Sequence, residues 1–421
     1  MTKHIKVKLI SGENIDFSKP QRRIIENDNE AINEKYIRGE VRIVTEQARY
    51  PLDSIKSMID SDKYRLNPDY QRRRRWDNDK KSKLIESFIM NVPIPPVFLY
   101  ENELSYYEVM DGQQRLSTIY DFYNDKIILS GLELWPELNK RKYSTLPEKI
   151  KQGIDRRYLS SIILLKESAK TNQEAQNMKQ LVFERINSGG VSLTPQETRN
   201  ALYDGPMNRL CLKLSENESL RKLIGLPTKQ ETPEQSYQLL FDFDEDYKNK
   251  SEVVLQDFEI YKRMEDVEYV LRFFAMRQVE GFTNLKLYEF LDYYLQKANQ
   301  FSQEVIDELA TLFIDTITFA DELLGKESFY LWRNRSTVKG ELVWYWFSRS
   351  TTTVYDPLMF ALTTMLSRKH ELLAQKNKIK DKLIVFYESN YSSFEGRNSN
   401  KNDIIKRREL YCQFFESIVG E

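Results

Sequence analysis

Histidine and cysteine are scarce in this 421-residue sequence, with two of each. A zinc hydrolase with several imidazole ligands or a Ser-His-Asp enzyme would have to use His4 or His370, and neither stands in a recognisable catalytic motif. Cys211 and Cys412 lie far apart and lack the paired spacing of a zinc or redox site. We therefore expect a protein of a reducing compartment without histidine-based catalysis.

Net charge and long hydrophobic runs are also missing. The 63 lysines and arginines nearly balance the 64 aspartates and glutamates, so any site for a polyanion must be local. The N-terminus lacks the apolar core of a signal peptide, and no later stretch is long and apolar enough to span a bilayer. The sequence predicts a soluble, cytoplasmic protein without a membrane partner.

Hydrophobic periodicity changes along the chain and predicts an α+β fold. Residues 1–50 are mixed and highly charged, and we expect an N-terminal arm with a short strand at 41–45. Residues 51–170 alternate short helical and strand patterns, which indicates a compact α+β domain. Residues 171–421 carry long amphipathic periods and are expected to form a helical domain.

The expected elements follow from the same periodicity. In the α+β domain we expect helices at 52–59, at 79–90 and after Gly112, and strands at 97–100, 106–110, 126–129 and 158–165. In the helical domain we expect helices at 175–186, 267–279, 285–298, 305–324 and 357–373. Two segments interrupt these helices: 228–250, which is acidic, and 332–350, which is rich in aromatic and basic residues.

The strongest local pattern is a strand that turns into a helix at Asp111-Gly112-Gln113-Gln114-Arg115. Asp111 can cap the helix, and Gly112 permits a sharp turn and close approach to the backbone. The N–H groups of the first helical turn and Arg115 then offer a cradle for phosphate. Gln113 and Gln114 can donate to phosphate oxygens or orient an attacking water. An ordinary capped turn with a surface arginine explains the same spacing.

A second cluster, residues 67–76, contains four consecutive arginines before Trp76. Arg72 and Arg75 are three positions apart and would share one face of a helix, where they would present two guanidinium groups to a polyphosphate. A charged helix start with Trp76 in the core accounts for the pattern equally well. Arginines beside an aromatic residue also fit a nucleic-acid contact.

A third cluster, residues 183–200, forms a helix junction. The first helix ends at a glycine pair, and the second opens with the capping box TPQE, which begins at Thr194. Capping explains these residues completely. It leaves Asn187, Arg199 and Asn200 as unexplained polar groups around the junction.

Together the three clusters resemble the N-terminal domain of GmrSD-type type IV restriction enzymes. The blocks are YQRRRRW, then VPIPPVFLY leading to YEVMDGQQRLSTIYDFY, then FERINSGGVSLTPQETRNAL, and their order and spacing match as well. The resemblance covers residues 51–203 closely and the later helices more loosely. It implies a fold similar to ParB and sulfiredoxin, in which a strand-turn-helix binds nucleotide phosphates. It also implies NTP hydrolysis at the DGQQR motif, controlling an antiviral nuclease.

The resemblance further implies roles for single residues. The catalytic residues would be Asp111, Gln113, Gln114 and Arg115. Nucleotide binding would involve Arg115 together with Gln71, Arg72, Gly112, Thr118, Asn187 and Arg199. The nucleotide would be an NTP, with ATP, GTP and CTP not distinguished. Magnesium is expected because polyphosphates usually arrive with it, and Asp111 would supply a hard oxygen ligand.

Enzymes of this type often carry a C-terminal HNH nuclease, whose histidine base lies near paired metal ligands. No such cluster surrounds His370. The resemblance therefore predicts an NTP-hydrolysing component of an anti-phage defence system. Nucleotide state would control engagement of DNA or of a separately encoded nuclease or effector. An oligomer is compatible with this role.

Two other hypotheses remain open. The first is a non-enzymatic DNA-binding or modified-DNA-sensing module, with basic residues on phosphate and aromatic residues on bases. Its residues would be Arg72 to Arg75, Arg333, Arg335, Lys339 and Arg349, with Trp332, Trp344, Tyr345 and Trp346. Helical packing is the ordinary use of such aromatic residues. The second is a toxin or an interaction scaffold whose pocket is degenerate. The acidic segment 242–247 is expected to be a solvated loop rather than a metal site, because it lacks the alternating ligand-and-glycine pattern of a calcium loop.

Overall fold

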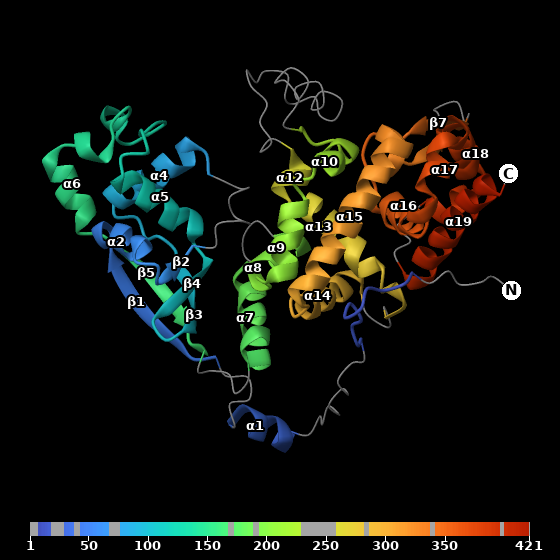
Figure 1. Cartoon of the computed structure of the whole chain (residues 1–421). Coiled ribbons are helices and arrows are strands. Elements are labelled where there is room, and N and C mark those ends of the chain that lie inside the picture. Colours follow the sequence, from blue (N-terminus) through green and yellow to red (C-terminus); the bar gives the residue numbers. More distant parts are fainter. Residues whose placement is uncertain are drawn as a thin grey trace. The chain divides into compact units, whose positions relative to one another are not determined.

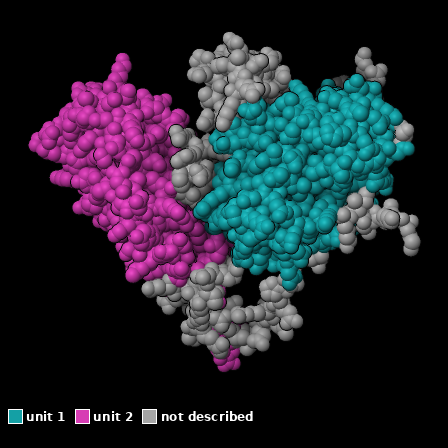
Figure 2. All heavy atoms as spheres, viewed as in Figure 1, with its two compact units in different colours: residues 1–20, 194–421 teal, residues 21–193 magenta. Residues whose placement is uncertain are grey.

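The computed structural model describes residues 7–17, 29–37, 43–66, 76–166, 172–187, 193–228, 258–281, 286–336, 342–395 and 400–420. The chain divides into two compact units (Figure 2). Residues 21–193 form the sheet unit, and residues 1–20 with 194–421 form the helical unit. The five-stranded sheet lies in the sheet unit and most of the long helices in the helical unit, so the predicted α+β class with a helical C-terminal region is confirmed.

The sheet unit is built on a mixed sheet. Its strands are β1 (Thr45–Pro51), β2 (Tyr64–Arg65), β3 (Val97–Glu103), β4 (Tyr106–Asp111) and β5 (Tyr158–Leu164). They are ordered β1-β5-β3-β4-β2, with β1/β5 and β3/β4 antiparallel and β3/β5 and β2/β4 parallel. Its helices are α1 (Asn29–Ile37), α2 (Ile55–Asp60), α4 (Asn78–Ile89), α5 (Gln113–Tyr123), α6 (Glu148–Asp155) and α7 (Asn172–Asn187) (Figure 1).

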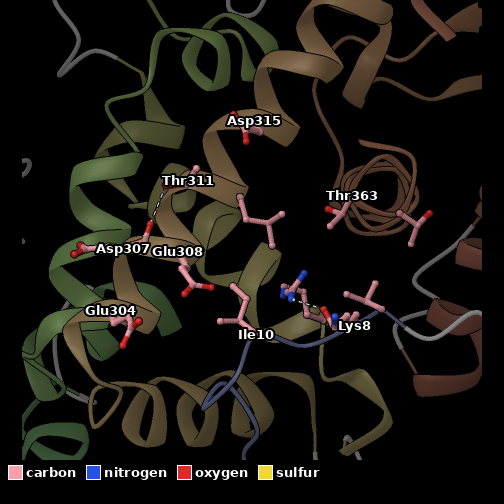
Figure 3. A pocket seen from close by; sticks show the side chains of 12 residues that line it. Lys8, Ile10, Glu304, Asp307, Glu308, Thr311, Asp315 and Thr363 are labelled. Atoms are coloured by element: carbon pink, nitrogen blue, oxygen red, sulfur yellow. Dashed lines mark hydrogen bonds between the residues drawn. The ribbon is translucent and has the colours of Figure 1, made fainter. Parts of the chain in front are cut away.

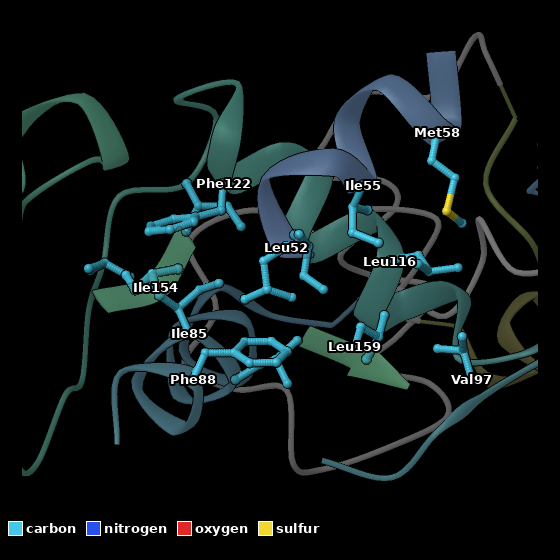
Figure 4. Close-up of a cluster of buried hydrophobic side chains, with 14 of the residues drawn as sticks. Leu52, Ile55, Met58, Ile85, Phe88, Val97, Leu116, Phe122, Ile154 and Leu159 are labelled. Atoms are coloured by element: carbon cyan, nitrogen blue, oxygen red, sulfur yellow. The ribbon is translucent and has the colours of Figure 1, made fainter. Parts of the chain in front are cut away.

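The core of the sheet unit lies on one face of the sheet. Val97 and Leu99, two positions apart in β3, point to this face and are fully buried with Leu116 of α5 (Figure 4). Side chains of α2, α4, α6, β5 and the segment 127–146 also belong to the cluster. Helix α7 contacts the opposite face at β4, because its Lys179 binds Glu108, which points away from the core residue Val109 next to it in the strand.

Two strand predictions differ from the structure. The strand predicted at 126–129 is wrong, although Ile128 is exposed between buried neighbours as alternation requires. The N–H of Leu129 donates to the carbonyl oxygen of Arg141, and the Leu129 carbonyl accepts from the N–H of Lys140, so the alternation belongs to a loop that pairs with another loop and not with a strand. The first strand begins at Thr45 rather than 41, because pairing with β5 starts there.

The helical unit contains helices of very different lengths. They are α8 (Pro195–Leu202), α9 (Pro206–Leu214), α10 (Glu218–Ile224), α12 (Glu259–Lys262), α13 (Glu265–Met276), α14 (Leu287–Ala298), α15 (Gln303–Leu323), α16 (Thr352–Thr364), α17 (Lys369–Ala374), α18 (Lys376–Phe394) and α19 (Lys401–Val419). A two-stranded ribbon, β6 (Trp332–Ser336) and β7 (Leu342–Trp346), separates α15 from α16. Every described helix is too short or too polar to cross a membrane.

The single helix predicted at 357–373 is wrong in its extent. The structure divides this stretch into α16 and α17, with a 3-10 turn at Leu366–Arg368 between them. Pro357 lies inside α16 rather than at its start. Residues 354–362 of α16 are all buried, and a helix buried on every side has no polar face to mark where it begins.

The N-terminal segment 7–17 packs within the helical unit. Arg277 donates from Nε and Nη2 to the carboxylate of Glu13, at 2.7 and 2.8 Å, and both side chains are buried. Phe17 stacks on Phe290, with 5.2 Å between ring centroids. The compact units thus divide the chain after residues 20 and 193, whereas periodicity placed the boundaries after residues 50 and 170.

Candidate functional site

Gly112 makes the turn between β4 and α5. Its φ of 96° lies in the left-handed region, which side chains with a Cβ rarely adopt. A Cβ at this position would lie 2.4 Å from Cγ1 of Val97, inside the core. The turn therefore requires glycine both for its backbone conformation and for its packing against the core. The sequence predicted the first of these two requirements.

Asp111 ends β4 and does not cap α5, so the predicted capping role is wrong. The N-cap is Gly112, which has no side chain to accept from the first N–H groups of the helix. The Asp111 carboxylate instead accepts from Arg115 Nη2 at 2.5 Å, because Arg115 lies one helical turn further on. The N-cap position of α5 therefore carries no side-chain acceptor, and the positive end of the helix dipole lies beside Arg115.

Arg115 joins the turn to the VPIPP segment. Its Nη1 donates to the carbonyl oxygens of Pro95 and Pro96, at 3.3 Å for Pro96, and its side chain is only 12% exposed. Three acceptors therefore set the orientation of the guanidinium group. Sequence reasoning missed the two proline carbonyls, although VPIPP was part of the motif block that carries the resemblance.

The two glutamines of the motif differ in exposure. Gln113 is buried, whereas Gln114 is half-buried and its Oε1 accepts from the backbone N–H of Trp76 at 3.2 Å. Trp76 packs partly against the core of the sheet unit, in line with the hypothesis that residues 67–76 are a charged helix start with Trp76 in the core. Trp76, which follows the arginine run in the sequence, therefore lies beside the turn. Gln71 and Arg72 lie outside the described residues.

Two further predicted residues of the sheet unit lie within helices, Thr118 in α5 and Asn187 in α7. Thr118 is buried one turn into α5, and its hydroxyl donates to the carbonyl oxygen of Gln114 at 2.6 Å. The hydroxyl proton of Thr118 is therefore already used in a hydrogen bond within α5. Asn187 is the last residue of α7, and its side chain is outside what the structure describes.

A buried ion pair attaches α7 to the strand that leads into the turn. Lys179 Nζ lies 2.7 Å from Glu108 Oε2, and both side chains are largely buried. The ammonium group also lies 5.3 Å from the ring centroid of Tyr100 in β3. Periodicity could not show this pair, because its members are 71 residues apart.

Arg199 belongs to the helical unit, and its side chain is 1% exposed. Its guanidinium bonds to Asp292 at 2.6 Å, Glu268 at 3.0 Å and Gln196 at 3.1 Å, and to the Tyr288 carbonyl oxygen at 3.2 Å. The structure therefore surrounds this predicted pocket residue with acceptors from its own unit. The capping box of α8 beside it is present as predicted.

Arg199→Ala is expected to destabilise the helical unit by about 3 kcal/mol, because it removes a buried side chain together with its bonds to the half-buried carboxylates of Glu268 and Asp292. Urea unfolding followed by circular dichroism would measure the loss. Arg209→Ala is a matched control, because Arg209 pairs with Asp204 at the surface. Unchanged stability with weaker NTP binding would contradict this assignment and support a role for Arg199 in the pocket.

A pocket of about 1000 Å³ opens in the helical unit and is formed by residues of that unit alone (Figure 3). Glu304, Asp307, Glu308 and Asp315 of α15 line it. Their spacing is that of one helix face, and a solvated face of an amphipathic helix accounts for them. Among the described residues, no three histidine, cysteine, aspartate or glutamate side chains are grouped to hold a metal ion.

Residues 55–203 match the family model described as GmrSD restriction endonuclease, N-terminal domain. The matched stretch contains the turn at Gly112, the arginine run and the junction before α8, so the resemblance inferred from the three motif blocks is confirmed. This match implies involvement in a restriction-type system of defence against phage. No curated protein and no solved structure matches the chain. The likeness to ParB and sulfiredoxin stays a prediction.

Proposed function

We propose that the chain binds and hydrolyses a nucleoside triphosphate at the turn formed by residues 111–115, within a restriction-type defence system. In this proposal, nucleotide state controls engagement of DNA or of a separately encoded effector. The main supporting observation is the left-handed glycine followed by a helix start without an N-cap side chain, beside a fixed arginine. The family match supports the same assignment, because its domain includes this turn.

The start of α5 has the properties of a phosphate site. Its first N–H groups and the positive end of its dipole favour a polyphosphate. Arg115 adds a full positive charge whose orientation is set by Asp111 and the proline carbonyls. An incoming phosphate would compete with Asp111 for Arg115 Nη2, because both groups are anionic acceptors.

Hydrolysis at this turn would depend on positioning. Water attacks the terminal phosphorus, and the new P–O bond forms as the bond to the leaving phosphate oxygen breaks. Gln114 is better placed than Gln113 to orient the water, because Gln114 is less buried and Trp76 already holds its Oε1. Arg115 would stabilise the charge that moves onto the phosphate oxygens.

Magnesium would arrive with the polyphosphate. Asp111 supplies the one carboxylate of the turn, and because Oδ2 accepts from Arg115, Oδ1 is left as a single ligand. Magnesium in nucleotide sites is commonly held by one or two carboxylates and by phosphate oxygens. We therefore expect the metal to bind with the nucleotide rather than before it.

Phosphate release from ATP, GTP, CTP and UTP, measured separately with the purified full-length chain and magnesium, tests the proposal. Hydrolysis of at least one nucleotide is expected, with loss of activity when the metal is chelated. Reactions with and without phage or plasmid DNA would show whether DNA alters turnover. Absence of both binding and hydrolysis for all four nucleotides would overturn the proposal.

A further inference from the structure

The ribbon formed by β6 and β7 has two faces of different character. Trp332 pairs with Trp346 across the strands, and Trp344 lies on the same face by alternation. This face packs on α18: the rings of Trp344 and Trp346 lie edge-on to Tyr391 and Tyr387, at 5.3 and 6.0 Å between centroids. Figure 1 places β7 beside α18. The tryptophans therefore anchor the ribbon to the helical unit.

The opposite face carries alternating guanidinium groups and rings. Arg335 lies 5.2 Å from the ring centroid of Tyr345, and Arg333 lies 5.8 Å from the same ring. Arg333 is also 4.8 Å from the ring of Phe347, and Arg349 is 5.6 Å from that ring. We call these five residues the arginine ladder. They are all half-buried or exposed, so the ladder lies at the surface.

The charge of the arginine ladder is not neutralised within the described part of the chain. None of its three arginines forms an ion pair with a described residue. The ladder influences one acidic group, Glu265. Burial raises the pKa of Glu265, the nearby Glu268 raises this pKa further, and the positive charge of Arg349 lowers it. Stacking on rings orients a guanidinium group while leaving its edge N–H groups available to an acceptor.

We propose that the arginine ladder binds the phosphodiester backbone of duplex DNA. A two-stranded antiparallel ribbon is one of the elements that the major groove of B-DNA admits. Arg333 and Arg335 on the ribbon and Arg349 just beyond β7 place three positive groups at the surface, where they complement the regular charges of a phosphate backbone. The ribbon is anchored through its other face and therefore presents its two arginines rigidly. The choice of DNA rests on the restriction-type role proposed above, whereas the anionic ligand follows from the ladder itself.

Binding of a fluorescent DNA duplex to the full-length chain, measured by anisotropy over a range of salt concentrations, tests this inference. The variant R333Q/R335Q is expected to bind roughly tenfold more weakly or worse, and the slope of log K against log salt should fall by about 2, one unit for each lost phosphate contact. R209Q/R368Q is the matched control, because it removes the same charge from two exposed arginines paired with carboxylates.

A second variant separates charge from folding. R333K/R335K keeps both charges and should retain most of the affinity and of the salt slope, and tryptophan emission reports whether the ribbon stays anchored. Wild-type affinity in R333Q/R335Q, or equal competition by duplex RNA, would overturn the inference. NTP hydrolysis measured on the same samples keeps the two proposals apart, since R333Q/R335Q should hydrolyse like wild type and loss of DNA binding does not depend on that activity.

Discussion

Gly112→Ala is expected to lower the free energy of unfolding of the sheet unit by about 3 kcal/mol, the sum of left-handed backbone strain of ~1–2 kcal/mol and overpacking of ~1–3 kcal/mol. The added methyl group would meet Cγ1 and Cβ of Val97, at 2.4 and 2.9 Å, and neither atom belongs to a flexible chain end. A loss of this size is a large part of the stability of a typical domain. The same change should abolish nucleotide binding at the turn.

Urea unfolding, with hydrogen exchange to locate the loss in β4 and α5, would measure this effect. Gly153→Ala is the matched control, because a Cβ there meets nothing within 4 Å and the backbone is helical. That change should be neutral or stabilise by ~0.5–1 kcal/mol. Adding Val97→Ala to Gly112→Ala should relieve the clash but not the backbone strain. Equal stability of the Gly112 and Gly153 variants would contradict the assigned role.

Replacing Arg115 by alanine is expected to reduce NTP hydrolysis by about 100-fold or more, the usual effect of removing one preorganised donor to a developing negative charge. Phosphate release at saturating nucleotide measures the change, and phage challenge measures its consequence in cells. Because Arg115 also bonds to Pro95 and Asp111, some loss of stability is expected as well. Arg156→Ala, which removes an exposed arginine of the same unit, is the matched control.

Gln114→Glu tests the same site without removing the contacts of Arg115. The carboxylate keeps an acceptor for the Trp76 N–H, but it places a negative charge and no amide donor beside the phosphates. We expect a thermal midpoint close to wild type and a large loss of nucleotide affinity. Wild-type hydrolysis by both Arg115→Ala and Gln114→Glu would mean that the turn is only structural.

Local patterns predicted much of the sheet unit. Helix α4, strands β3, β4 and β5, and the start of α5 lie within a few residues of their predicted positions, because each combines a clear period with a turn or capping signal. The loop at 126–129 shows the limit of such patterns, since alternation records which side chains are buried and not whether a strand is paired.

The residues and contacts of the candidate site could be predicted only in part from local sequence patterns. The residues from Asp111 to Arg115 are adjacent in sequence, so their gathering at one turn needed no tertiary information. The role of Asp111 was misread, because an aspartate before a helix favours a cap, whereas an arginine four positions on offers it a stronger partner. The contacts of Arg115 with Pro95 and of Gln114 with Trp76 depend on segments that only folding brings together.

The sequence by itself determined the α+β class, the glycine turn and the resemblance to a restriction-enzyme domain, because each resides in short-range periodicity or in motifs read along the chain. Tertiary structure decided which charged residues are enclosed and which face outward. Arg199 and Arg277 are buried against carboxylates from distant helices or from the N-terminal segment, whereas the arginine ladder faces solvent. Burying a charge requires a partner, and partners far apart in the chain meet only when the whole unit folds.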